Sequence, residues 1–238
     1  MDLSDPTRSV TSTLDGPVLA VMAAVGKPLT VGQVAELAVR GSEIGVRRSL
    51  DRLVSQGIIR AQIIGRTQVY ELNREHLAAS VAVILAGLRN ELWRRLREEL
   101  QTWTVRPLVA TAFGSVVRAD GDEASDIDLL VVHPPFLGET PARKLPQSTM
   151  QQITDLVAQL AYRPSEPDAA GTWQTQLDRL RDRVEAWTGN QVQIVDLDVW
   201  SWQRPDPTLE PLLANIRADG IDLVSPTTPS LTGAGRGR

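Results

Sequence analysis

Short apolar runs alternate with turn residues along the first third of the chain and predict three helices followed by a β-hairpin. Helices are expected over 17–25, ended by Gly26, and over 30–40, where Thr30 and Gln33 form a capping box. Ser42 caps the third helix, whose buried stripe repeats at i, i+4, i+7 and i+8: Val46, Leu50, Leu53 and Val54. Alternation around Gly65 predicts the hairpin.

Leucines recur about one turn apart over 75–103 and predict a long amphipathic helix that connects two modules. Its expected apolar seam is Leu77, Val81, Leu85, Leu88, Leu92, Leu96 and Leu100. Beyond it, the pattern predicts strands over 108–113, 126–132 and 192–200, a turn at Gly114 and Ser115, and helices over 148–162, 173–187 and 207–218. We therefore expect an α+β fold of two domains, with residues 11–74 in the first, residues 104–225 in a second built on a mixed sheet, and a flexible tail over 226–238.

Composition narrows the chemistry. The 238 residues include no Cys and two His, which excludes disulfides, thiolate metal sites and a Cys nucleophile. Any metal is therefore expected to be a hard ion held by carboxylates. The start of the chain lacks the apolar core of a signal peptide, and no apolar run is long enough to span a membrane, so we expect a cytoplasmic protein without a membrane partner.

Charge is distributed unevenly, because residues 40–66 carry +4 and the remaining chain −8. Three helices and a hairpin are also the order of a winged helix-turn-helix domain, expected here over 11–74. Double-stranded DNA is then an expected partner, with Arg47, Arg48 and Arg52 of the third helix in the major groove and Arg60 and Arg66 of the hairpin on phosphates or in the minor groove. The alternative is that these arginines solubilise a helical face and the module contacts proteins. Winged modules usually bind as dimers, so we expect a homodimer through the connecting helix.

Three Asp-x-Asp pairs occur in the chain: Asp120 and Asp122, Asp126 and Asp128, and Asp196 and Asp198. The middle pair lies on a predicted strand, so both side chains share one face, where they can hold one or two divalent cations. The alternative is that they are exposed residues of a strand edge. Gly114 and Ser115 precede this pair at the end of a buried strand, where a turn exposes backbone N–H groups and a hydroxyl to a polyphosphate.

The segment GSVVRADGDEASDIDLLVV resembles the signature of the DNA polymerase beta superfamily of nucleotidyltransferases, especially its minimal, antibiotic-nucleotidyltransferase-like branch. Matching positions are Gly114, Ser115, Ser125, Asp126, Asp128 and Leu129. Arg118 matches a basic residue that often follows the Gly-Ser, whereas Ala119 stands where the family commonly has a second Gly. The signature covers about twenty residues, and the order of strands and helices extends the resemblance over 107–224.

The resemblance implies a metal-dependent enzyme that transfers a nucleoside monophosphate from a nucleoside triphosphate (NTP), such as ATP, to a hydroxyl acceptor. Asp126 and Asp128 would bridge two Mg²⁺ ions, or Mn²⁺, with the nucleotide held by Gly114, Ser115, Arg118 and Ser125. Asp196 and Asp198 are both candidates for a third carboxylate that takes the acceptor's proton. Asp196 is favoured because it directly follows the apolar VQIV.

The sequence leaves two further alternatives open. The acceptor can be a small drug, an RNA 3′ end, or a hydroxyl of a partner protein, the last within a toxin–antitoxin-like system. In the second alternative, the chain is a transcription regulator, or an antitoxin-type partner, whose nucleotidyltransferase-like domain is a catalytically weak nucleotide sensor.

Overall fold

The computed structural model describes residues 1–141, 144–159 and 168–225 as a mixed α and β fold in two compact units. Unit 1 comprises residues 1–92 together with 121–124, and unit 2 comprises the rest. The division falls inside the long helix α4 (Ala79–Gln101). The expected tail 226–238 and the last three residues of the helix expected over 148–162 lie outside the described residues.

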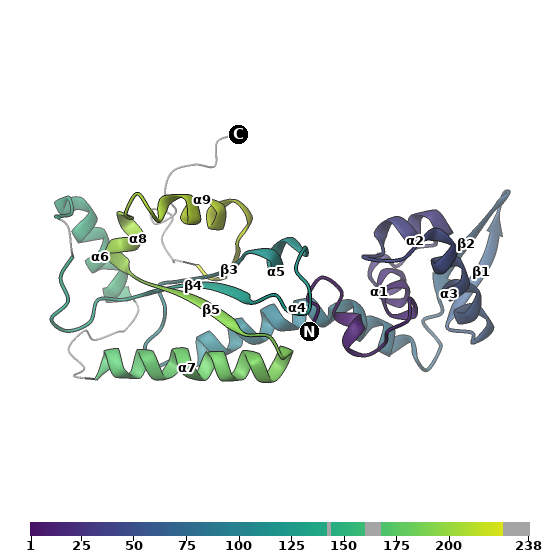
Figure 1. Cartoon of the computed structure of the whole chain (residues 1–238), viewed down its shortest axis with the longest axis horizontal. Helices are drawn as coiled ribbons and strands as arrows, with labels where there is room; N and C mark the ends of the chain where they lie inside the picture. Colours follow the sequence, from purple (N-terminus) through teal and green to yellow (C-terminus); the bar gives the residue numbers. More distant parts are fainter. Residues whose placement is uncertain (142–143, 160–167, 226–238) are drawn as a thin grey trace. The chain divides into compact units, whose positions relative to one another are not determined.

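Unit 1 has the predicted order of helices and hairpin (Figure 1). A short 3₁₀ helix η1 (Pro6–Ser9) precedes α1 (Asp15–Val25), α2 (Val31–Leu37) and α3 (Glu43–Ser55). Strands β1 (Ile59–Ile64) and β2 (Thr67–Leu72) pair antiparallel. The capping box is confirmed, with Gln33 N–H donating to Thr30 Oγ1 at 3.3 Å. The core packs all three helices against the hairpin through buried side chains such as Val18, Leu50 and Tyr70.

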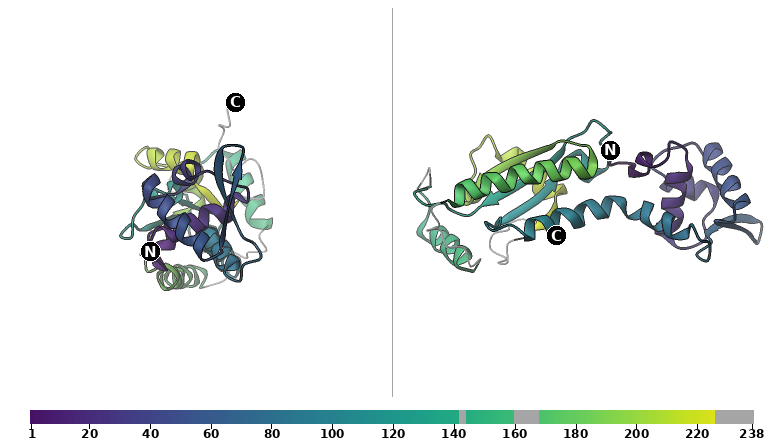
Figure 2. Two further views of the ribbon diagram at one scale, coloured as in Figure 1. Left: turned by 90° about the vertical axis from the view of Figure 1, so that its right-hand side faces the viewer. Right: turned by 90° about the horizontal axis from the view of Figure 1, so that it is seen from below.

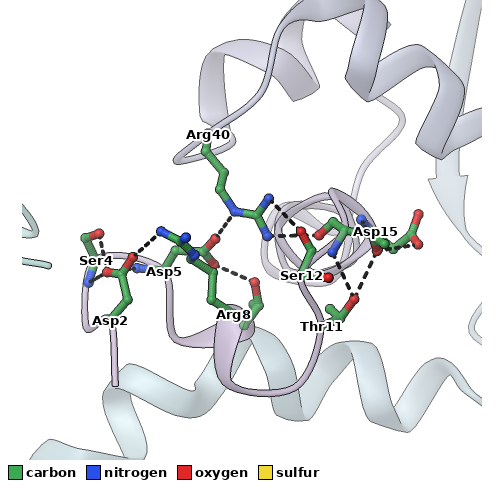
Figure 3. Close-up of polar contacts among 10 residues, drawn as sticks. Asp2, Ser4, Asp5, Arg8, Thr11, Ser12, Asp15 and Arg40 are labelled. Atoms are coloured by element: carbon green, nitrogen blue, oxygen red, sulfur yellow. Dashed lines mark hydrogen bonds and ion pairs between the residues drawn. The ribbon is translucent and has the colours of Figure 1, made fainter. Parts of the chain in front are cut away.

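Polar contacts of Arg40, in the loop between α2 and α3, hold the N-terminal segment in place (Figure 3). Arg40 donates from Nε to Asp5 Oδ2 at 2.5 Å and from its terminal nitrogens to the carbonyls of Ser12 and Thr13. Asp5 is only 3% exposed, so the ion pair is largely sequestered. The charge of Arg40, whose side chain is 25% exposed, is therefore paired with a buried carboxylate.

A second polar contact joins α1 to α3 through Asp15. Ser49 Oγ donates to Asp15 Oδ1 at 2.6 Å, and Arg52 forms an ion pair with the same carboxylate. Burial by itself raises the pKa of Asp15, but the hydrogen bonds from Arg52, Ser49 and Thr13 outweigh it, and the pKa lies below its ordinary value. The ionised carboxylate is thus the form that holds the two helices together.

The prediction of a continuous apolar seam along the connecting helix is wrong for its first residues, Leu77 and Val81. Leu77 lies before α4 and is 97% exposed, and Val81 is 49% exposed, whereas Leu85, Leu92, Leu96 and Leu100 are buried. Residues spaced four apart drift around a helix of 3.6 residues per turn, so one row of side chains cannot stay on one face for six turns. Among the described helices, none is long and apolar enough to cross a membrane.

Unit 2 is built on a four-stranded sheet in the order β5-β4-β3-β6. Its strands are β3 (Val109–Phe113), β4 (Ile127–His133), β5 (Val192–Asp198) and β6 (Ile221–Val224). β3 runs antiparallel to β4 and β6, and β4 runs parallel to β5. The strand expected over 192–200 ends early, because Asp198 accepts from Ser201 N–H at 2.7 Å and caps a helix. β6 was not expected from the sequence.

Helices cover both faces of this sheet. On one face, α7 (Ala169–Thr188) lies beside the end of α4 (Figure 2), and Glu99 of α4 pairs with Arg183 of α7 at 2.8 Å. The other face packs against α6 (Gln147–Gln159), α8 (Val199–Gln203) and α9 (Glu210–Asp219) (Figure 1). A four-residue helix, α5 (Ser115–Arg118), follows β3 directly. The two layers fix the ends of β3, β4 and β5, where the candidate residues lie.

We predict that Asp15→Asn lowers the free energy of unfolding of unit 1 by about 1 kcal/mol at neutral pH, because the ion pair with Arg52 is lost. The lowered pKa of Asp15 sets the sign of the pH dependence. The carboxylate's contribution is present above its ordinary value of 3.8 and is lost as the pH falls through the lowered folded-state pKa.

Hydrogen exchange of the α1 and α3 amides measures this effect, with wild type and variant converging in acid. Unfolding of unit 2, followed by tryptophan fluorescence, is the control and should be the same in both proteins, because all six Trp lie at or beyond Trp93 in that unit. Equal exchange in both proteins at neutral pH would contradict the assignment.

Candidate active site

The turn after β3 approaches the carboxylate of Asp128 so closely that only glycine fits. Gly114 has φ 79° and ψ −159°, a region of backbone space that side chains avoid. A Cβ placed on Gly114 would overlap Asp128 Oδ2. The approach follows from the register of the sheet, in which Phe113 pairs with Asp128 across the antiparallel strands β3 and β4. Gly114 and Asp128, both predicted site residues, are therefore in contact.

α5 continues this turn and carries Ser115 and Arg118. The N–H groups of Val117 and Arg118 donate to the Gly114 carbonyl at 3.2 and 3.3 Å. The helix ends at Ala119, which is left-handed with φ 62° and is the one non-glycine residue with positive φ among the described residues. A left-handed alanine costs about 1 kcal/mol, so the backbone at this position favours glycine.

Asp126 and Asp128 flank the first residue of β4, so strand alternation turns both side chains to the same side of the sheet. A hydrogen bond from Asn190 fixes the loop before them. Asn190 is 3% exposed and donates from Nδ2 to the Ser125 carbonyl at 2.9 Å. Ile127 N–H also donates to the Gln191 carbonyl at 2.9 Å. Ser125 thus enters the site through its backbone, as an anchor of the acidic pair.

The two carboxylates repel each other. Burial raises the pKa of Asp128, the charge of Asp126 raises it further, and Arg118 partly opposes both. Arg118 itself donates from Nε to Asp120 Oδ2 at 3.0 Å. Gly114, Asp126, Asp128 and Arg118 therefore lie close together, and the two carboxylates give this region a negative charge that a cation would offset.

Neither candidate for a third carboxylate lies beside this pair. Asp196 pairs with Val131 across the parallel strands β4 and β5, which places it on the opposite face of the sheet from Asp128. There its Oδ2 accepts from Trp173 Nε1 of α7 at 3.0 Å. Asp198 is occupied as the N-cap of α8. The preference for Asp196 rested on the preceding apolar run, and that run does not specify the register of β5 against β4.

The side chain that the sheet does bring to the pair is Gln193. It is the residue opposite Asp128 in the register, and its Nε2 donates to Asp126 Oδ2 at 3.3 Å. Gln193 was not expected at the site, because only the acidic residues of this strand were considered as ligands. Consistently, no group of three or more His, Cys, Asp or Glu side chains suited to a metal ion is present within the described ranges.

The five arginines predicted to contact DNA differ in their surroundings within unit 1. Arg52 pairs with Asp15, and Arg60 pairs with Glu75 at 2.6 Å. Arg47 lies 3.8 Å from Glu43 on the same face of α3. Arg48 on α3 and Arg66, which follows Gly65 at the hairpin turn, are exposed. Arg47, Arg48 and Arg66 therefore present charge to solvent, whereas Arg52 also serves the contact between α1 and α3.

We predict that Gly114→Ala lowers the free energy of unfolding of unit 2 by about 2–4 kcal/mol, because strain at positive φ adds to the overlap with Asp128. The matched control is Gly138→Ala. Gly138 also has positive φ (85°), but a Cβ there meets nothing within 4 Å, so we expect a cost of about 1 kcal/mol.

Urea unfolding followed by tryptophan fluorescence measures both variants. Equal losses would show that the backbone angle alone matters and that the turn does not press against Asp128.

Comparisons with known proteins address the same segment. A family described as nucleotidyltransferase domain matches residues 90–184. No curated protein and no solved structure matches the chain. The matched residues include the Gly114 turn and the Asp126 and Asp128 pair, and they end before β5 begins. Over this segment the chain is similar to nucleotidyltransferase domains, which supports a nucleotidyl transfer function at a general level.

Proposed function

We propose that unit 2 transfers a nucleoside monophosphate from an NTP to a hydroxyl acceptor, with a divalent cation held by Asp126 and Asp128. The observation that carries this proposal is the contact between the Gly114 turn and the Asp128 carboxylate. It joins a turn that can receive phosphate oxygens to a pair of carboxylates that can hold a metal ion. A metal-bound triphosphate needs both kinds of group.

The donors at this site fit a hard divalent cation such as Mg²⁺ or Mn²⁺. Asp126 and Asp128 supply carboxylate oxygens, and their mutual repulsion is the source of part of the raised pKa of Asp128. When bound, such a cation neutralises phosphate charge and favours ionisation of the attacking hydroxyl. Protonation competes with the cation for the same oxygens. As the pH is lowered, the affinity for the cation should therefore begin to fall at a higher pH than it would at an Asp with the ordinary pKa.

The chain's own residues bind and orient the substrate in this proposal. Gly114 and Ser115 receive the terminal phosphates, and Arg118 offsets negative charge that develops on them. The acceptor oxygen bonds to the α-phosphorus while the bond from that phosphorus to the bridging oxygen breaks. Pyrophosphate leaves with the electron pair, and the hydroxyl proton passes to solvent. Small molecules, RNA 3′ ends and protein hydroxyls all satisfy this chemistry as acceptors.

We predict that Asp126→Asn and Asp128→Asn each reduce nucleotidyl transfer by at least about 100-fold, because each removes a charged ligand of the cation. The measurement is transfer of label from α-³²P-labelled NTPs with Mg²⁺ to the protein itself, to RNA or to cell lysate. Asp182→Asn, an exposed carboxylate on α7, is the matched control and should behave as wild type.

Transfer that persists unchanged in both variants would refute the assignment of the site. Nucleotide binding that depends on both carboxylates, without transfer to any acceptor, would instead favour the second candidate function, a nucleotide-sensing regulator.

We also propose that unit 1 binds double-stranded DNA as a winged helix-turn-helix domain. The observation in favour is that exposed cations occur on both elements that such a domain uses. Arg47 and Arg48 lie on α3, and Arg66 lies at the turn of the hairpin. α3 would enter the major groove, and the hairpin would reach the phosphates beside it.

A homodimer on DNA is part of this proposal. Val81 and Ile84 of α4 are 49% and 62% exposed and lie three residues apart. Intervals of this kind place apolar side chains on one face, the pattern with which two helices pack together. A second copy of the chain is the proposed occupant, since a dimer would match a two-fold symmetric DNA site.

We predict that the double change of Arg47 and Arg48 to Ala weakens duplex binding about tenfold and lowers the slope of log affinity against log salt by about two. Arg106→Ala, an exposed arginine of unit 2, is the control. Fluorescence anisotropy measures affinity, and sedimentation measures stoichiometry, with two copies per duplex expected. Binding that is unaffected by the double change, or a single copy per duplex, would contradict the corresponding part of the proposal.

A further inference from the structure

Gln193 occupies the position of the sheet from which a third ligand could reach the acidic pair. β4 and β5 run parallel, and Gln193 is the Cα partner of Asp128. Residues paired in this way present their side chains to the same face. The contact from Gln193 Nε2 to Asp126 Oδ2 agrees with this placement. Gln193 therefore touches the site from the neighbouring strand.

The acids of β5 are committed elsewhere. Asp196 lies three residues beyond Gln193, an odd step, and therefore faces α7, where Trp173 donates to it. Asp198 accepts from both the N–H and the hydroxyl of Ser201, at 2.7 and 2.6 Å. Moving either carboxylate to the other face would require a one-residue slip of β5, which would also turn Val192 and the other residues of the strand over.

An amide in this position differs from a carboxylate in two ways. It carries no charge, so Asp126 and Asp128 together match the charge of one divalent cation, whereas a third carboxylate would attract cations more strongly. It also cannot accept a proton from an acceptor hydroxyl near neutral pH, as a carboxylate can. What the amide does supply is an N–H donor that holds Asp126 in place.

We propose that Gln193 is the third side chain of this site, a positioning residue whose neutral amide limits both the affinity for divalent cations and the rate of transfer. This inference rests on the proposed function, because it presumes that Asp126 and Asp128 hold the cation. It implies a site that binds metal-bound nucleotide more readily than it turns it over.

The test is a titration of the full chain with Mn²⁺, followed by electron paramagnetic resonance of the free ion, in the absence of nucleotide. Gln193→Glu should bind Mn²⁺ about tenfold more tightly than wild type, because it adds a charge beside the pair. It should also accelerate nucleotidyl transfer. The matched control is Gln174→Glu, which adds the same charge on the exposed side of α7 and should behave as wild type.

Two further variants separate the possible failures. Asp126→Asn should abolish Mn²⁺ binding, and Asp196→Asn, which keeps an oxygen for Trp173, should leave it unchanged. If Asp126→Asn abolishes binding but Gln193→Glu binds as wild type does, the inference is overturned and the proposed function stands. Loss of Mn²⁺ binding in Asp196→Asn would overturn the inference in the same way. If Asp126→Asn binds normally, the proposed function fails and the inference fails with it.

A folding control keeps the result interpretable. Without cation, Gln193→Glu adds a third negative charge to the pair and should lower the urea midpoint of unit 2 by tryptophan fluorescence. Saturating Mn²⁺ should raise that midpoint more in this variant than in wild type. An equal response of both proteins to Mn²⁺ would also overturn the inference.

Discussion

The candidate site depends on one close approach, between the backbone at Gly114 and the carboxylate of Asp128. The pairing of β3 with β4 sets the distance, and the absence of a side chain at Gly114 permits it. Because the turn continues at once into α5, the same constraint places Ser115 and Arg118 beside the acidic pair. A side chain at this position would overlap Asp128 Oδ2, so that the carboxylate or the turn would have to shift, and the positive φ would add strain.

Charge is the second organising feature of unit 2. Burial raises the pKa of Asp128 and the like charge of Asp126 raises it further, a cost that a bound cation would relieve. The third neighbour is an amide, so in the proposed function two carboxylate charges alone would attract the cation, and the site would have little means of removing a proton. A site of this kind suits a protein in which nucleotide binding itself acts as a signal. The nucleotidyltransferase and nucleotide-sensor hypotheses are therefore two outcomes of the same geometry.

Local signals in the sequence predicted the helices of unit 1, its hairpin, the Gly-Ser turn and the face shared by Asp126 and Asp128. The errors concern interactions between distant segments. Asp196 and Gln193 could be told apart only from the register of β5 against β4, which depends on packing against α7 and α8. The exposed part of α4 and the pairing of Arg52 with Asp15 likewise depend on partners that periodicity within one helix does not reveal.

A crystal structure of the full chain with Mg²⁺ and a non-hydrolysable NTP tests the central claim most directly. We expect a cation about 2.0–2.1 Å from oxygens of Asp126 and Asp128, phosphates against Gly114 and Ser115, Gln193 adjoining the same cation, and Asp196 still bonded to Trp173. A cation bound by Asp196 or Asp198, or a nucleotide seated away from the Gly114 turn, would contradict this claim.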